Sequence, residues 1–219
     1  MKKISLFFFI ITILNNLSAQ DDSGKLESWK GIKLTKELNN FKVNLSGEIR
    51  LKDYGEIYNQ SLFEPELEYR FKFIKLGYNI RYINEYDDQG KITGFQNFIR
   101  NQKYIEFSQK INRTKISLKY IDQQKKAVKF DFSNKNIDYS RLQLNLEYNI
   151  KKFKVDPKIG LELFYKDDIN FKNRRDKFRF KLGSEFGKKN KLKFTYIIEN
   201  QFNKLTTHII KSIYEINLN

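Results

Sequence analysis

The chain has 219 residues and no cysteine, so it has room for one large all-β domain or two small domains, and disulfides and thiolate metal sites are excluded. Its residues are 40% hydrophobic, 16% aromatic and 31% charged, which excludes a disordered chain. The formal net charge of +16 would suit nucleic acid, but the basic residues are spread along the whole chain and an export signal precedes them, so no nucleic-acid partner is expected.

The first twenty residues have the pattern of a cleaved secretory signal peptide. Lys2 and Lys3 precede the apolar run ISLFFFIITIL, and small and polar residues follow before Asp21. The run is shorter than the roughly 20 residues that a membrane-spanning helix needs. We expect cleavage near Ala19 or Gln20, which leaves residues 21–219 as one exported domain.

Beyond Gly31, large apolar residues recur at every second position in a long series of segments. A strand places such residues on one face, whereas a helix would scatter them around its axis. Most segments run for about nine to eleven residues, the length that a tilted strand needs to cross a membrane. The apolar positions of the predicted strands span Ile32–Leu34, Phe41–Ile49, Leu67–Phe73, Leu76–Tyr82, Ile105–Ile111, Ile116–Tyr120, Leu142–Ile150, Phe153–Tyr165, Phe178–Phe186, Leu192–Ile198 and Ile210–Leu218.

The connections between these segments alternate in length. LNN, IK, NR, KK and GKKN are short, whereas 52–62, 84–100, 122–139 and 166–176 are long and polar. This layout predicts an all-β, up-and-down antiparallel transmembrane barrel of about 10–12 strands, with short periplasmic turns and longer extracellular loops. About eleven segments are found, but bacterial single-chain barrels have an even number. Either Trp29–Leu38 lies at the seam or in the lumen of a ten-stranded barrel, or one strand is overlooked.

The apolar faces are expected to contact lipid, because exposure of so many to water would be untenable. Aromatic rings at both ends of the strands match the two interfacial girdles of such barrels. The opposite face of each strand would then line the lumen, where charges of both signs pair. The predicted lumen residues are Glu48, Arg50, Glu66, Glu68, Arg70, Lys72, Arg81, Glu106, Lys119, Arg141, Glu147, Lys158, Glu162, Arg179, Lys181, Glu185, Lys193 and Glu199.

Four stretches of the mature chain carry a family resemblance: WKGIKLTKELNNFKVNLSGEIR, EPELEYRFKF, KLGYNIRY and HIIKSIYEINL. Through them the chain resembles domain-of-unknown-function family 2490, an uncharacterised outer-membrane barrel family. The resemblance implies an outer-membrane barrel and supplies no catalytic residues. The chain departs from many such barrels at its end, which is Leu218-Asn219 and not an aromatic residue.

The function predicted from these features is non-enzymatic: a narrow pore or a structural or surface-interaction protein in the outer membrane of a Gram-negative cell. Expected partners are outer-membrane lipids, lipopolysaccharide and the barrel-insertion machinery. No cofactor, metal or catalytic residue is predicted, and the oligomeric state is left open. One alternative is a soluble periplasmic, lipocalin-like barrel that binds an apolar ligand. A second is a lipid hydrolase using His208, but Ser212 would lie roughly 13 Å from it along one strand.

Overall fold

The computed structural model describes residues 25–87, 94–128, 137–151, 155–167, 174–187, 189–202 and 204–218. The predicted signal peptide lies outside the described residues. The described chain forms eleven β-strands and one 3-10 turn, η1 (Asp53–Gly55). The strands are β1 (Lys25–Leu38), β2 (Phe41–Lys52), β3 (Ile57–Phe71), β4 (Ile74–Asp87), β5 (Gly94–Ile111), β6 (Thr114–Ala127), β7 (Ile137–Tyr148), β8 (Val155–Asp167), β9 (Arg174–Phe186), β10 (Lys191–Gln201) and β11 (Thr207–Asn217).

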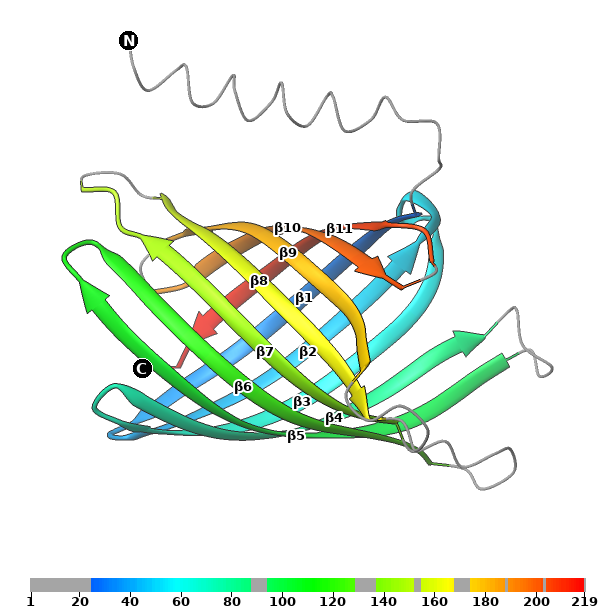
Figure 1. The fold of residues 1–219 in the computed structure, drawn as a ribbon, viewed down its shortest axis with the longest axis horizontal. Coiled ribbons are helices and arrows are strands. Elements are labelled where there is room, and N and C mark those ends of the chain that lie inside the picture. The colour runs from blue at the N-terminus through cyan, green and yellow to red at the C-terminus, as the bar shows by residue number, and fades with distance from the viewer. Residues whose placement is uncertain are drawn as a thin grey trace, which may run out of the picture.

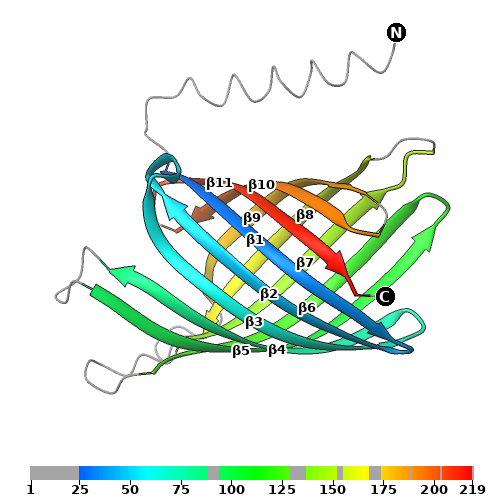
Figure 2. The same cartoon turned by 180° about the vertical axis from the view of Figure 1, so that it is seen from behind.

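The strands form one closed barrel in which each strand pairs antiparallel with the next (Figure 1). The ring is closed by β1 and β11, which lie side by side and run parallel (Figure 2). Their register is continuous from Lys25 opposite Thr207 to Thr35 opposite Asn217. The expectation of an even strand number is therefore wrong. In an odd-numbered up-and-down barrel the first and last strands point the same way, so they can close the ring only as a parallel pair.

The predicted alternation of short and long connections gives the barrel two distinct ends. We call the end with the tight connections the turn side and the opposite end the loop side. Three turns on the turn side begin with a residue of positive φ: Asn39 (53°), Lys72 (52°) and Asn112 (54°). Lys72, predicted to line the lumen, therefore belongs to the turn between β3 and β4. The predicted turn at Ile74 is two residues too late, because Ile74 already pairs with Phe71.

The strands reach further toward the loop side than the sequence predicted. The expected loop 52–62 is largely strand, since η1 is followed by β3 from Ile57. β5 is the longest strand, with 18 residues, and β4 and β5 extend past the rest of the barrel (Figure 1). As a result, residues such as Arg100, expected at a loop boundary, lie within the barrel wall.

The two faces of the barrel wall differ sharply in chemistry. Large apolar side chains point outward on every strand, and even mid-strand examples such as Leu144 and Phe180 are about 40% exposed, at 42% and 39%. The alternate positions point inward and are more buried. They include Asn44, Gln102 and Glu162, all buried polar residues. The fold is thus apolar outside and polar inside. Within the described ranges, no helix is long and apolar enough to cross a bilayer.

Candidate functional site: the barrel lumen

The inward face carries a dense network of ion pairs. Within the described chain, sixteen of the eighteen predicted lumen residues form ion pairs with other residues of the barrel strands, and Lys72 and Lys119 do not. Lys119 lies with its ammonium 3.3 Å from the centre of the Tyr104 ring. Alternation along each strand accounts for this convergence, since inward positions of neighbouring strands lie directly opposite one another.

Glu162 is the most buried carboxylate of this network. Its side chain is fully inaccessible and lies among three cations, Arg141, Lys181 and Arg179. The Lys181 ammonium is 2.6 Å from Glu162 Oε2, and Arg141 also donates to Gln123. A carboxylate without water needs this many partners, because a buried charge without them is very costly.

A second cluster of charges lies at the seam, where β1 and β11 pair to close the ring. Glu48 accepts from Arg50 at 2.7 Å and from Lys211 at 2.5 Å, so it links β2 to β11 across β1. The guanidinium of Arg50 lies 3.7 Å from the ring centre of Trp29, which is itself buried. Trp29 donates from Nε1 to Glu27. The seam is therefore held by side chains as well as by its parallel backbone ladder.

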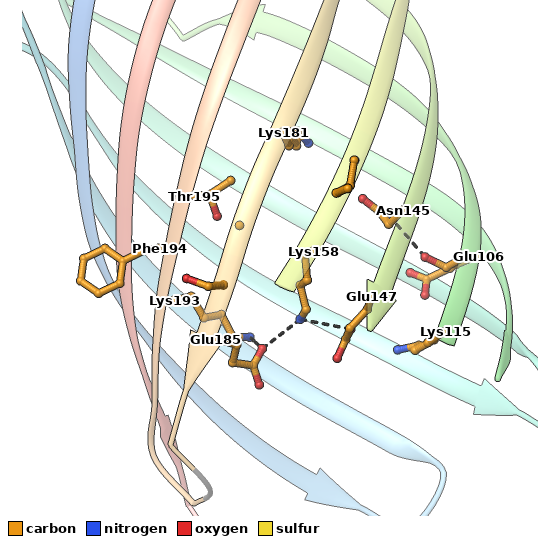
Figure 3. Close-up of a pocket in the computed structure, with 15 residues that line it drawn as sticks. Glu106, Lys115, Asn145, Glu147, Lys158, Lys181, Glu185, Lys193, Phe194 and Thr195 are labelled. Carbon is orange, nitrogen blue, oxygen red and sulfur yellow. Dashed lines mark hydrogen bonds and ion pairs between the residues drawn. The ribbon is translucent and has the colours of Figure 1, made fainter. Parts of the chain in front are cut away.

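A turn-side cavity of ≈ 270 Å³ opens inside the barrel (Figure 3). Lys158 lies between two carboxylates, 3.2 Å from Glu147 and 2.9 Å from Glu185. Glu185 also pairs with Lys191 at 2.5 Å. Figure 3 shows Phe194 pointing away from this cavity, as expected for an outward position. Charges of the two signs are closely balanced here.

A larger loop-side cavity of ≈ 640 Å³ has many cations in its lining. Its lining contains eleven lysine and arginine side chains and two glutamates. Trp29 and Phe164 form apolar parts of its wall, and Phe164 lies under Arg141, Lys177 and Arg179 at 4.6–4.9 Å. The two cavities share Lys181 and Thr195, so they adjoin one another within the lumen.

Sequence reasoning missed several inward residues. Lys33 and Lys211 follow the alternation of their strands and could have been found from it. Trp29, Tyr104 and Phe164 follow the same alternation, but they were missed because only charged side chains were taken as lumen residues. Arg100 was placed in a predicted loop. Trp29 and Phe164 supply aromatic contacts in the loop-side cavity, and Lys33, Arg100 and Lys211 supply part of its positive charge.

His208, the basis of the hydrolase alternative, lies outside this lumen chemistry. Its Nδ1 is 2.6 Å from the Tyr196 hydroxyl, and the two rings stack. Across the part of the chain that the structure describes, no group of three or more metal-ligating side chains is arranged to hold a metal ion.

A family model for proteins of unknown function, DUF2490, matches residues 26–210. This match covers almost the whole barrel, from the first residues of β1 to the first part of β11. The chain belongs to the DUF2490 family. No curated protein and no solved structure matches the chain significantly. For this DUF2490 member, the barrel and its lumen are therefore the features that point to a function.

Proposed function

We propose that this protein is an integral outer-membrane barrel without enzymatic activity, whose lumen forms a narrow polar path. The observation that carries the proposal is the outward apolar surface, which runs around the barrel on every strand. Such a surface far exceeds the few hundred Å² of apolar patch found on soluble monomers. In a bilayer it would contact acyl chains, and no strand edge would be left unpaired.

The organisation of the lumen supports the same proposal. A soluble barrel that carries an apolar ligand needs an apolar interior, whereas this interior holds ion pairs such as Lys75–Glu106 and Lys193–Glu215. The two cavities adjoin at Lys181, which is held in an ion pair with the buried Glu162. A solute path through such a lumen would be narrow and lined by fixed charges.

Lipid-borne fluorescence quenching tests the membrane location. Trp29 is the single tryptophan and is buried in the lumen, so brominated acyl chains should leave its fluorescence unquenched in vesicles. A matched variant, Trp29→Phe with Phe180→Trp, moves the fluorophore to the middle of β9 on the outward face. Its emission should be strongly quenched.

The two results together separate the alternatives. Quenching of neither protein would indicate a soluble barrel and overturn the proposal, and quenching of Trp29 alone would mean that the wall is inside out. Heat-modifiable migration on a gel is the expected companion result for a membrane barrel. Conductance steps in a planar bilayer would then establish the narrow path, and a folded, inserted barrel without any conductance would leave the structural or surface-interaction role.

A further inference from the structure

Arg100 occupies an unusual position in the loop-side cavity. It lies in β5, directly opposite Arg81 on β4 and Lys125 on β6. Three cations therefore stand side by side across three neighbouring strands, an arrangement that is destabilising unless each charge is compensated. Arg81 pairs with Glu64, and Lys125 lies 3.1 Å from Glu85.

Arg100 has no such ion pair. No carboxylate of the described residues lies within ion-pair distance of its guanidinium, and its Nε is buried without a hydrogen-bond partner. The charges that act most strongly on it are Arg81, Arg141, Glu64 and Arg50, of which three are positive. Burial of the Arg100 charge is therefore only partly compensated, since Glu64 is the one attractive charge among these four.

The surroundings of Arg100 suit an anion of limited size. The cavity has ≈ 640 Å³, and its cations outnumber the carboxylates that pair with them. Several of the cations are also held in place. Arg50 stacks on Trp29, and Arg141 on Phe164. Groups positioned before a ligand arrives lose little conformational entropy when it binds.

We propose that Arg100 is the centre of a binding site for a small oxyanion, a solute that carries a phosphate or carboxylate group. The planar fork of arginine matches the oxygens of both groups. This inference rests on the proposed lumen function and names the class of solute that the path accepts. The ligand neutralises the one arginine in the lining of this cavity that has no ion pair among the described residues, so the lumen is selective for anions.

Ligand-dependent thermal stability of the full-length barrel, folded in a zwitterionic detergent, tests the site. Inorganic phosphate and acetate are each compared with chloride at equal ionic strength. At least one of the two should raise the unfolding temperature of the wild type, by roughly 3–6 °C at ten times its Kd. Arg100→Gln should abolish this shift, and Arg100→Lys, which keeps the charge but not the fork, should reduce it.

The matched control is Lys103→Gln, which removes one positive charge from the outward face of the same strand and should keep the full shift. In chloride, Arg100→Gln should be at least as stable as the wild type, because it removes an unpaired charge. Equal stability in all three salts, or a shift that survives in Arg100→Gln, would overturn the site. Lipid quenching of the Phe180→Trp protein does not depend on Arg100, so it reports separately on the barrel's membrane location.

Discussion

The ring of Tyr104 occupies the space in which a side chain at Gly77 would have to lie. The two residues are directly opposite on β5 and β4, and a Cβ built at Gly77 would overlap the far end of the ring. In this position the Tyr104 hydroxyl donates to Glu66 at 2.8 Å and lies 3.1 Å from Glu68. The missing side chain at Gly77 therefore positions two carboxylates of the lumen.

Gly77→Ala should displace the Tyr104 ring and lower the free energy of unfolding by about 1–3 kcal/mol, the usual cost of overpacking. Chemical denaturation in detergent or vesicles measures the change. The same substitution should cost much less in a Tyr104→Ala background, because the two residues are in contact. Gly47→Ala is the control, since its new methyl group would meet only the Leu62 carbonyl oxygen, at 4.0 Å. Equal losses at positions 77 and 47 would contradict the role given to the tyrosine.

Arginine at the centre of the outward face should impair insertion. Leu144→Arg or Phe180→Arg would place a charge among acyl chains at mid-strand, which costs a barrel about 2–4 kcal/mol. Folding titrations into lipid vesicles provide the measurement. Gln143→Arg is a matched control, because this neighbour faces inward opposite Glu162 on β8. If the outward and inward substitutions impaired insertion equally, the assignment of the outward face to lipid would be wrong.

Removal of the Glu162 charge should be the most damaging single change to an ion pair. Glu162→Gln leaves Arg141, Lys181 and Arg179 facing one another without their common carboxylate, and we expect a loss of about 3–5 kcal/mol. Glu37→Gln is the comparison, since Glu37 is 49% exposed and pairs only loosely, so its loss should cost at most about 1 kcal/mol. Similar losses at both sites would mean that water reaches Glu162 freely.

Arg81 and Arg70 look equivalent in the sequence but differ in the structure. Arg81 pairs with Glu64 deep in the lumen, with 17% of its side chain exposed, whereas the Arg70 side chain is 40% exposed near the turn side. Arg81→Ala should therefore lower the unfolding temperature and raise single-channel conductance together, by removing a buried pair and side-chain volume. Arg70→Ala should change both much less. An Arg81→Ala barrel with wild-type stability and conductance would contradict a filled lumen.

Lys72 adopts a backbone conformation that favours glycine or asparagine. Its φ of 52° is matched at the equivalent turn positions by Asn39 and Asn112. A residue with a Cβ is strained in this conformation, and lysine lacks the short polar side chain through which asparagine offsets the strain. Lys72→Gly should therefore raise the free energy of unfolding by about 1 kcal/mol. The reciprocal Asn112→Lys should lower it by a similar amount. Denaturation midpoints of the two variants should move in opposite directions, and a shift in the same direction would show that the lysine side chain stabilises its turn.

The alternation of apolar and polar residues was enough to predict the barrel and most of its inward ion pairs. Successive side chains of a strand point to opposite faces, so once a strand is correctly placed, the face to which each of its side chains points is known. The same regularity hid the turn at Lys72. Phe71 and Phe73 continue the alternation, so the sequence shows no break where the chain reverses.

The centre of the candidate site could not be predicted in this way. Arg100 was assigned to a loop, since two of the outward positions near it, Asn97 and Asn101, are polar and interrupt the apolar alternation on either side of Ile99. Trp29 and Phe164 occupy inward positions of their strands, but they were missed because only charged side chains were taken as lumen residues. Only the pairing of β5 with β4 and β6 shows that three cations are neighbours.

Because the first and last strands are parallel, the two ends of the described chain lie at opposite ends of the barrel. β1 starts at the loop side and β11 ends at the turn side, so the described chain enters the barrel at one mouth and leaves it at the other. β2 to β11 form five hairpins, whereas β1 runs once along the wall, from the loop side to the turn side, and has no hairpin partner. Because β11 has 11 residues, the two ends are separated by about 36 Å along the wall. A circular permutation would need a linker as long as a further strand, and labels fused at the two ends would report on opposite sides of any membrane the barrel spans.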